Sequence, residues 1–192
     1  MLSPVMKFVF NRRVFSLPKV SRSDAVLVEQ LHSLVFSDPK SREVIDMGFK
    51  EALAVFEEPD YSLPYSSYNI PIKHFSDKIA EEQQGMVNLC RVFILRAGCK
   101  MPRPEIHRNS IQRLVSFKGE GTIFSATPGG VDMTFNGCQI VSPDSNGSSI
   151  EKNWDVVPMN TWHFPVAGDK EDWFTVTFHS VPEAEIIDEY AE

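Results

Sequence analysis

Two histidines of this chain stand in segments whose local pattern would present them for chemistry. Glu105 and His107 are separated by one residue, so in an extended strand both side chains point to the same face. His163 follows a turn led by Pro158, in which Asn160 tolerates the left-handed conformation, and it begins a strand-like run. Because carboxylates and imidazoles are common ligands of metals, these side chains are the first candidates for a functional site.

The two segments resemble the paired motifs of the cupin superfamily. The first cupin motif contains a glycine, a His-x-His pair, a glutamate and a second glycine, and the second contains a Pro-x-Gly turn followed by a histidine. Here a glutamate stands where the first histidine is usual, a glutamine where the glutamate is usual, and an asparagine where the turn glycine is usual. The matching positions are Gly98, Glu105, His107, Gln112 and Gly119, then Pro158, Asn160 and His163.

The resemblance implies a barrel that holds one divalent metal ion, with Glu105, His107, Gln112 and His163 as candidate ligands. Two imidazoles and one carboxylate match the facial triad of non-haem iron oxygenases, which leaves coordination positions open for substrate and O₂. Gln112 is neutral and a poorer ligand than glutamate, so it could instead orient a water or the substrate. We expect the donor atoms of Glu105, His107 and His163 to lie within a few ångströms of a common point. The metal could be iron, manganese, zinc or nickel, and the alternative is a barrel with a degenerate, metal-free site.

Four further residues are candidates for binding a substrate. Arg103 and Arg113 flank the first motif and could attract a carboxylate or a phosphate, although charged residues beside a turn are often simply solvated. Trp162 precedes His163 and could either stack on a ligand or pack in the core. His179 ends a strand-like run and could either face the cavity or make a structural hydrogen bond.

The elements that must position these residues change in kind along the chain. Apolar residues recur at helical spacing over 25–35 and, after Pro39, over 44–56, which predicts two helices. From residue 86 onward, short runs rich in β-branched and aromatic residues predict strands, and the pairs Gly129-Gly130 and Asn136-Gly137 predict hairpin turns. With the resemblance, this predicts a mainly β protein: a helical extension at 1–85, a cupin-like double-stranded β-helix (jelly-roll barrel) at 86–182, and an acidic, solvated tail at 183–192.

One predicted strand has an outward face that needs a cover. If Gln112 faces the interior, then Leu114 does too, while Val115 and Phe117 face outward. A row this apolar must be covered either by the N-terminal helices or by a second subunit. Cupins commonly dimerise through a sheet face, so the resemblance implies a homodimer.

The composition bounds the class of protein. The chain has 192 residues, of which 42% are hydrophobic and 23% charged, as expected for a globular domain with a full core. The net charge of −7 argues against a broad nucleic-acid-binding surface. No apolar run approaches the roughly 18 residues of a membrane span, and the three scattered cysteines fit free thiols in a reducing compartment. We therefore expect a cytoplasmic protein that binds a small molecule and neither nucleic acid nor membrane.

Two hypotheses for the function follow. The first is a metal-dependent enzyme acting on a small polar or anionic molecule, with dioxygenase chemistry placed slightly ahead of isomerase or lyase chemistry. The second is a non-catalytic binding or sensor protein whose site is degenerate or metal-free. The resemblance cannot choose between them, because the same barrel hosts many chemistries.

Overall fold

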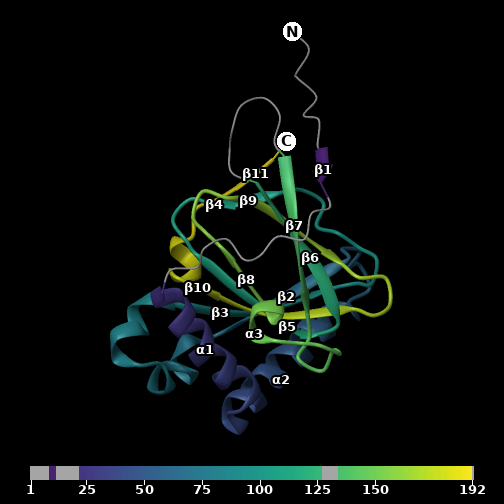
Figure 1. The fold of residues 1–192 in the computed structure, drawn as a ribbon. Helices are drawn as coiled ribbons and strands as arrows, with labels where there is room; N and C mark the ends of the chain where they lie inside the picture. Colours follow the sequence, from purple (N-terminus) through teal and green to yellow (C-terminus); the bar gives the residue numbers. More distant parts are fainter. Residues whose placement is uncertain (1–8, 12–21, 127–133, 192) are drawn as a thin grey trace.

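The computed structural model describes residues 9–11, 22–126 and 134–191, with side chains described for 24–126 and 134–191. Two β-sheets face each other, and two helices lie against the outer face of one of them (Figure 1). Among the described residues, no helix is long and apolar enough to cross a membrane.

The helices are α1 (Arg22–Phe36) and α2 (Pro39–Val55), and they confirm the predicted helical region. Asp38 caps α2 by accepting a hydrogen bond from the backbone N–H of Ser41 at 2.7 Å. Pro39 occupies the first turn, where its missing N–H leaves no helical hydrogen bond unmade. The apolar faces of both helices are buried against the sheet, through Leu27, Leu31, Ile45 and Phe49 among others.

The strands form one five-stranded and one six-stranded sheet. The five-stranded sheet has the order β2-β3-β10-β5-β8. Its strands are β2 (Tyr65–Ile70), β3 (Leu89–Leu95), β10 (Trp173–His179), β5 (Gln112–Lys118) and β8 (Trp154–Val157). The six-stranded sheet has the order β1-β7-β6-β9-β4-β11. Its strands are β1 (Val9–Asn11), β7 (Thr134–Val141), β6 (Glu120–Ala126), β9 (Trp162–Ala167), β4 (Glu105–His107) and β11 (Asp188–Tyr190).

Pairing is antiparallel throughout the described strands except between β1 and β7, which run parallel. A short helix, α3 (Ile150–Asn153), leads into β8. The remaining helical elements are 3₁₀ turns at Ile72–His74, Ser76–Lys78, Glu81–Met86 and Glu183–Glu185.

The predicted domain boundaries need two corrections. Strand β2 lies in the stretch assigned to the helical extension, yet it pairs with β3 along its whole length. Strand β11 lies in the stretch assigned to a solvated tail, yet it pairs with β4. Both segments are poor in β-branched residues, so their strand conformation comes from pairing with a neighbour rather than from local propensity.

The hairpin predicted at Asn136-Gly137 is also wrong, because both residues lie inside the continuous strand β7, opposite Ser125 and Phe124. Gly137 does not form a turn but lets β7 pack closely against the Thr122 side chain on β6. A Cβ at this position would lie 2.9 Å from the methyl carbon of Thr122. The hairpin predicted at Gly129-Gly130 lies outside the described residues.

The outward-facing apolar side chains of β5 are covered by helices α1 and α2, which is one of the two alternatives that the sequence predicted. The Phe117 ring lies 5.9 Å from that of Phe36 on α1 and 4.8 Å from that of Phe49 on α2, between centroids. Val115 is fully buried in the same cluster, while Leu114 belongs to the separate core between the sheets. Because the helices cover this face, it does not require a second subunit. The homodimer therefore stays a prediction that rests on the family resemblance.

We expect Gly121→Ala to lower the free energy of unfolding by about 1–3 kcal/mol, measured by urea denaturation. A Cβ at Gly121 would lie 2.3 Å from Cε3 of Trp173, whose ring is fully buried and donates a hydrogen bond to the Ser116 hydroxyl at 3.1 Å. The ring therefore cannot move aside without breaking this bond. Gly85→Ala is the control, because its Cβ would meet nothing within 4 Å. Equal midpoints for the two variants would contradict the prediction.

Candidate metal centre

Strands β4 and β9 bring the two sequence segments together inside the barrel. Glu105 on β4 lies directly opposite His163 on β9, and antiparallel partners project to the same face. The turn before β9 has the predicted form: Asn160 has a φ of 59°, and its N–H donates to the His107 carbonyl at 2.9 Å. That hydrogen bond ties the second segment to the end of β4.

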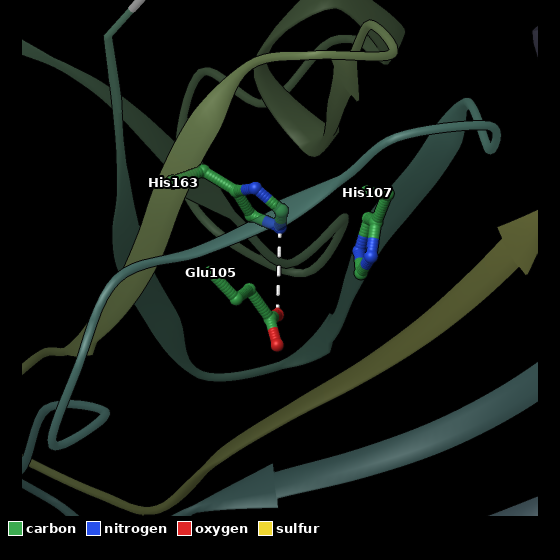
Figure 2. A group of neighbouring side chains, drawn as sticks. All are labelled: Glu105, His107 and His163. Carbon is green, nitrogen blue, oxygen red and sulfur yellow. Dashed lines mark ion pairs between the residues drawn. The ribbon is translucent and has the colours of Figure 1, made fainter. Parts of the chain in front are cut away.

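Glu105, His107 and His163 point toward one another in this interior (Figure 2). One ligand atom from each lies within 4.8 Å of the others. The ring centroids of His107 and His163 are 4.9 Å apart, and His163 Nε2 lies 3.5 Å from Glu105 Oε1. Both histidines are buried, with exposed fractions of 3% and 1%. Glu105 therefore points into the interior, and the three donor atoms converge as the sequence predicts.

Hydrogen-bond partners assign the same tautomer to both histidines. His107 Nδ1 lies 2.6 Å from Asp188 Oδ1, and His163 Nδ1 lies 3.1 Å from the carbonyl oxygen of Thr161. A carboxylate and a carbonyl can only accept, so in each neutral imidazole the hydrogen is on Nδ1. The Nε2 lone pairs of both rings are then left for the cavity.

The atoms around this point are acceptors that face one another. His163 Nε2 is buried without a hydrogen-bond partner, and 3.5 Å to the Glu105 carboxylate is too long for a strong hydrogen bond. On the other side, Gln112 Oε1 lies 3.3 Å from His107 Nε2. Converging lone pairs require a positive centre between them. The three residues could therefore hold a divalent metal ion.

Glu105 is ionised, as a metal ligand must be. Burial by itself would raise the pKa of the Glu105 carboxyl, but the neighbouring His163, His107 and Arg91 outweigh that effect and hold the pKa below its usual value. Burial also lowers the pKa of His179 well below its usual value, so this imidazole is neutral. His179 Nδ1 lies 3.3 Å from the Ser110 hydroxyl, and its ring contacts that of His107.

Two facing, mainly antiparallel sheets thus carry the two motif segments on adjoining strands, with the motif side chains converging between the sheets. The fold is cupin-like. This cupin-like barrel, with its N-terminal helices, is the fold class predicted from the sequence.

No protein-family model and no curated protein sequence matches the chain. Among solved structures, the cupin-like chain is similar to an oxalate oxidase in complex with glycolate (13% identity, 68% of this chain and 57% of that one, TM-score 0.48). It is also similar to vicilin from the hazelnut Corylus avellana (11% identity, 69% and 33%, TM-score 0.46). A third match is Bacillus subtilis oxalate decarboxylase, a protein with Mn(II) centres (11% identity, 71% and 30%, TM-score 0.47). Each match spans less than two thirds of the other chain.

A cavity of about 350 Å³ extends from the triad. Besides the triad itself, three residues predicted from the sequence line it: Gln112, Arg103 and His179. Arg103 is exposed, with its guanidinium carbon 5.7 Å from the centre of the Tyr190 ring, which also lines the cavity.

Two predicted substrate-binding residues are not brought to this cavity. Arg113 is fully buried beneath α1, where its guanidinium pairs with Asp24 at 2.6 Å. It neighbours Gln112 on β5, so strand alternation turns it to the opposite face. Trp162 alternates with His163 in the same way and packs against the cluster of Ala126, Phe135 and Phe164. Neither residue is among those that line the cavity.

Two residues of the site were missed from the sequence. Arg91 lines the cavity from β3, and its only sequence signal is that it interrupts an otherwise apolar run, Leu-Cys-Arg-Val-Phe-Ile-Leu. Asp188 gave no signal at all, because it lies in a stretch with several other acidic residues.

Proposed function

We propose that this protein is a metal-dependent enzyme that acts on a small anionic molecule, with Glu105, His107 and His163 as the metal ligands. The observation that carries the proposal is the buried convergence of two imidazole Nε2 lone pairs and one carboxylate, with His163 Nε2 lacking a hydrogen-bond partner. Two histidines and one carboxylate leave coordination positions open for further ligands. This ligand set places dioxygenase chemistry slightly ahead of isomerase or lyase chemistry.

A bound divalent metal would act there as a Lewis acid or as a site for O₂ beside the substrate. The protein's own residues supply the rest of the environment. Gln112 presents its amide to the triad, where it orients a water or the substrate. His179 lines the same cavity, where its imidazole can form a hydrogen bond with a substrate group.

Arg91 supports an anionic substrate. Arg91 lines the cavity, as do Ser67 and Thr177. Its Nε donates to Asn69 Oδ1 at 2.8 Å, which holds the plane of the guanidinium group. Its Nη2 pairs with the exposed Glu183, at Oε1, at 3.2 Å, so a bound anion would share or replace this partner. Guanidinium groups recognise carboxylates and phosphates through paired hydrogen bonds, and a cavity of about 350 Å³ suits a small molecule.

We expect Arg91→Gln to weaken the binding of small carboxylates or phosphates at least about tenfold, because a charge-assisted hydrogen bond is lost. The measurement is a thermal-shift screen of small mono- and dicarboxylates and inorganic phosphate on metal-loaded protein, followed by titration of those that stabilise it. Arg96→Gln is the control, since Arg96 follows β3 and pairs with Asp172 away from the cavity lining. If no such anion binds the unmodified protein, the proposed substrate class is wrong.

Metal analysis tests the function itself. The protein is purified without an affinity tag or chelator, and its metal content is measured by mass spectrometry. About one redox-active metal per chain, with O₂ consumption when a bound anion is supplied, is the expected result. Protein that neither contains metal nor takes up Fe(II), Mn(II), Zn(II) or Ni(II) would support the alternative, a non-catalytic binding or sensor barrel.

A further inference from the structure

The C-terminal strand β11 is the outer neighbour of the strand that carries two of the three candidate ligands. β4 has only three residues, and its pairing with β9 is confined to Glu105 opposite His163. On its other side, β11 pairs with all three residues, with Asp188 opposite His107 and Tyr190 opposite Glu105. Without β11, β4 would be a short edge strand, held by its pairing at Glu105 and by the hydrogen bond from Asn160 N–H to the His107 carbonyl.

Alternation along β11 directs its side chains to two different sides. Asp188 and Tyr190 share the face of their partners, toward the site, and Tyr190 lines the cavity. Glu189 projects to the other side, where it pairs with Arg108, Oε1 to Nε, at 2.9 Å. Asp188 thus contacts a residue of the site, whereas its neighbour Glu189 pairs with an arginine on the other side of the strand.

Asp188 decides between two hydrogen-bonding arrangements of His107. With the hydrogen on Nδ1, the ring donates to Asp188 Oδ1 at 2.6 Å and keeps its Nε2 lone pair for the site. With the hydrogen on Nε2, the ring would donate to Gln112 Oε1 at 3.3 Å, and that lone pair would be lost. The shorter, charge-assisted bond to Asp188 favours the first arrangement.

We propose that Asp188 is a positioning residue: its carboxylate holds His107 in the tautomer that can bind a metal. Strand β11, by pairing with β4, places Asp188 beside His107. The consequence for metal affinity rests on the proposed function. The consequence for the tautomer rests on the two hydrogen bonds alone and holds in metal-free protein.

The test compares Asp188→Ala and Asp188→Asn with Glu189→Gln as the matched control on the same strand. The first readout is the His107 tautomer in metal-free protein, from two-bond ¹⁵N–¹H NMR correlations. The second is the affinity for Zn²⁺ by competition titration. We expect Nδ1–H in the unmodified protein and Nε2–H in Asp188→Ala, whose affinity falls about 10–100-fold. Asp188→Asn keeps the acceptor but loses the charge, so its affinity falls by less, and Glu189→Gln matches the unmodified protein.

A His107 ring that remains Nδ1–H in Asp188→Ala, with unchanged affinity, overturns the proposal. Should the alanine variant fail to fold by circular dichroism, Asp188→Asn decides, and an affinity equal to that of Glu189→Gln overturns it. If the unmodified protein binds no Zn²⁺, Mn²⁺ or Fe²⁺, the metal-dependent function fails separately, and the tautomer readout alone decides the role of Asp188.

Discussion

Replacing His163 with alanine is expected to abolish metal retention while leaving the barrel folded. His163 supplies one of three ligand atoms, and its Nε2 makes no hydrogen bond that the fold depends on. The ring borders the cavity beside that of His107, so its removal enlarges an existing cavity and does not open a new one in the apolar core. The measurement is metal content after dialysis, by mass spectrometry, with circular dichroism to confirm the fold.

His74→Ala is the matched control for this experiment. His74 is exposed in a 3₁₀ turn far along the chain from either motif, so its removal reports any adventitious binding by a surface imidazole. It should retain the metal content of the unmodified protein. A His163→Ala variant that keeps its full metal content would show that the site assignment is wrong.

Asp24→Ala should lower the free energy of unfolding by about 3–5 kcal/mol, the usual cost of leaving a buried charge without its partner. Arg113 has an exposed fraction of 0%, and its Nε and Nη2 both donate to Asp24 Oδ1, at 3.1 and 2.6 Å. After the substitution, the guanidinium keeps its hydrogen bond to the carbonyl oxygen of Met86 at 3.2 Å. Urea denaturation with an unchanged m-value measures the loss.

Asp46→Ala provides the comparison, since Asp46 pairs with Arg42 on the exposed side of α2 at 3.2 Å. Exposed pairs of this kind contribute about 0.5 kcal/mol or less. Metal content should stay unchanged in both variants, because Arg113 faces the helices and not the cavity. A loss of stability no greater in Asp24→Ala than in Asp46→Ala would mean that Arg113 finds another partner or water.

The wrong placement of Arg113 and Trp162 could have been avoided with the side-chain alternation that the sequence prediction already used. Alternation along β5 was applied to Gln112, Leu114, Val115 and Phe117, and the structure agrees at each of them. The same alternation turns Arg113 outward, so its assignment to the substrate conflicted with the rule that placed Gln112 inside. For Trp162, neighbouring His163, the reasoning is identical.

Other contacts were beyond any local pattern. Arg91 reaches the cavity because β3 lies between β2 and β10, and Asp188 reaches His107 because β11 adds to the free side of β4. A single charged residue in an apolar strand, or in an acidic stretch, has the same sequence signature whether it meets solvent or a site.

The sequence by itself determined the short-range features of this protein: two helices, most of the strands, the shared face of Glu105 and His107, and a left-handed turn at Asn160 before His163. These depend on side-chain alternation and backbone preference over a few residues, which the order of amino acids specifies directly. Tertiary structure alone decided that Glu105 lies opposite His163, that Asp188 holds His107, and that Asp24 pairs with Arg113. Each of these joins segments far apart in the chain, and their register is set by which strands pair and which faces are buried, a property of the whole fold.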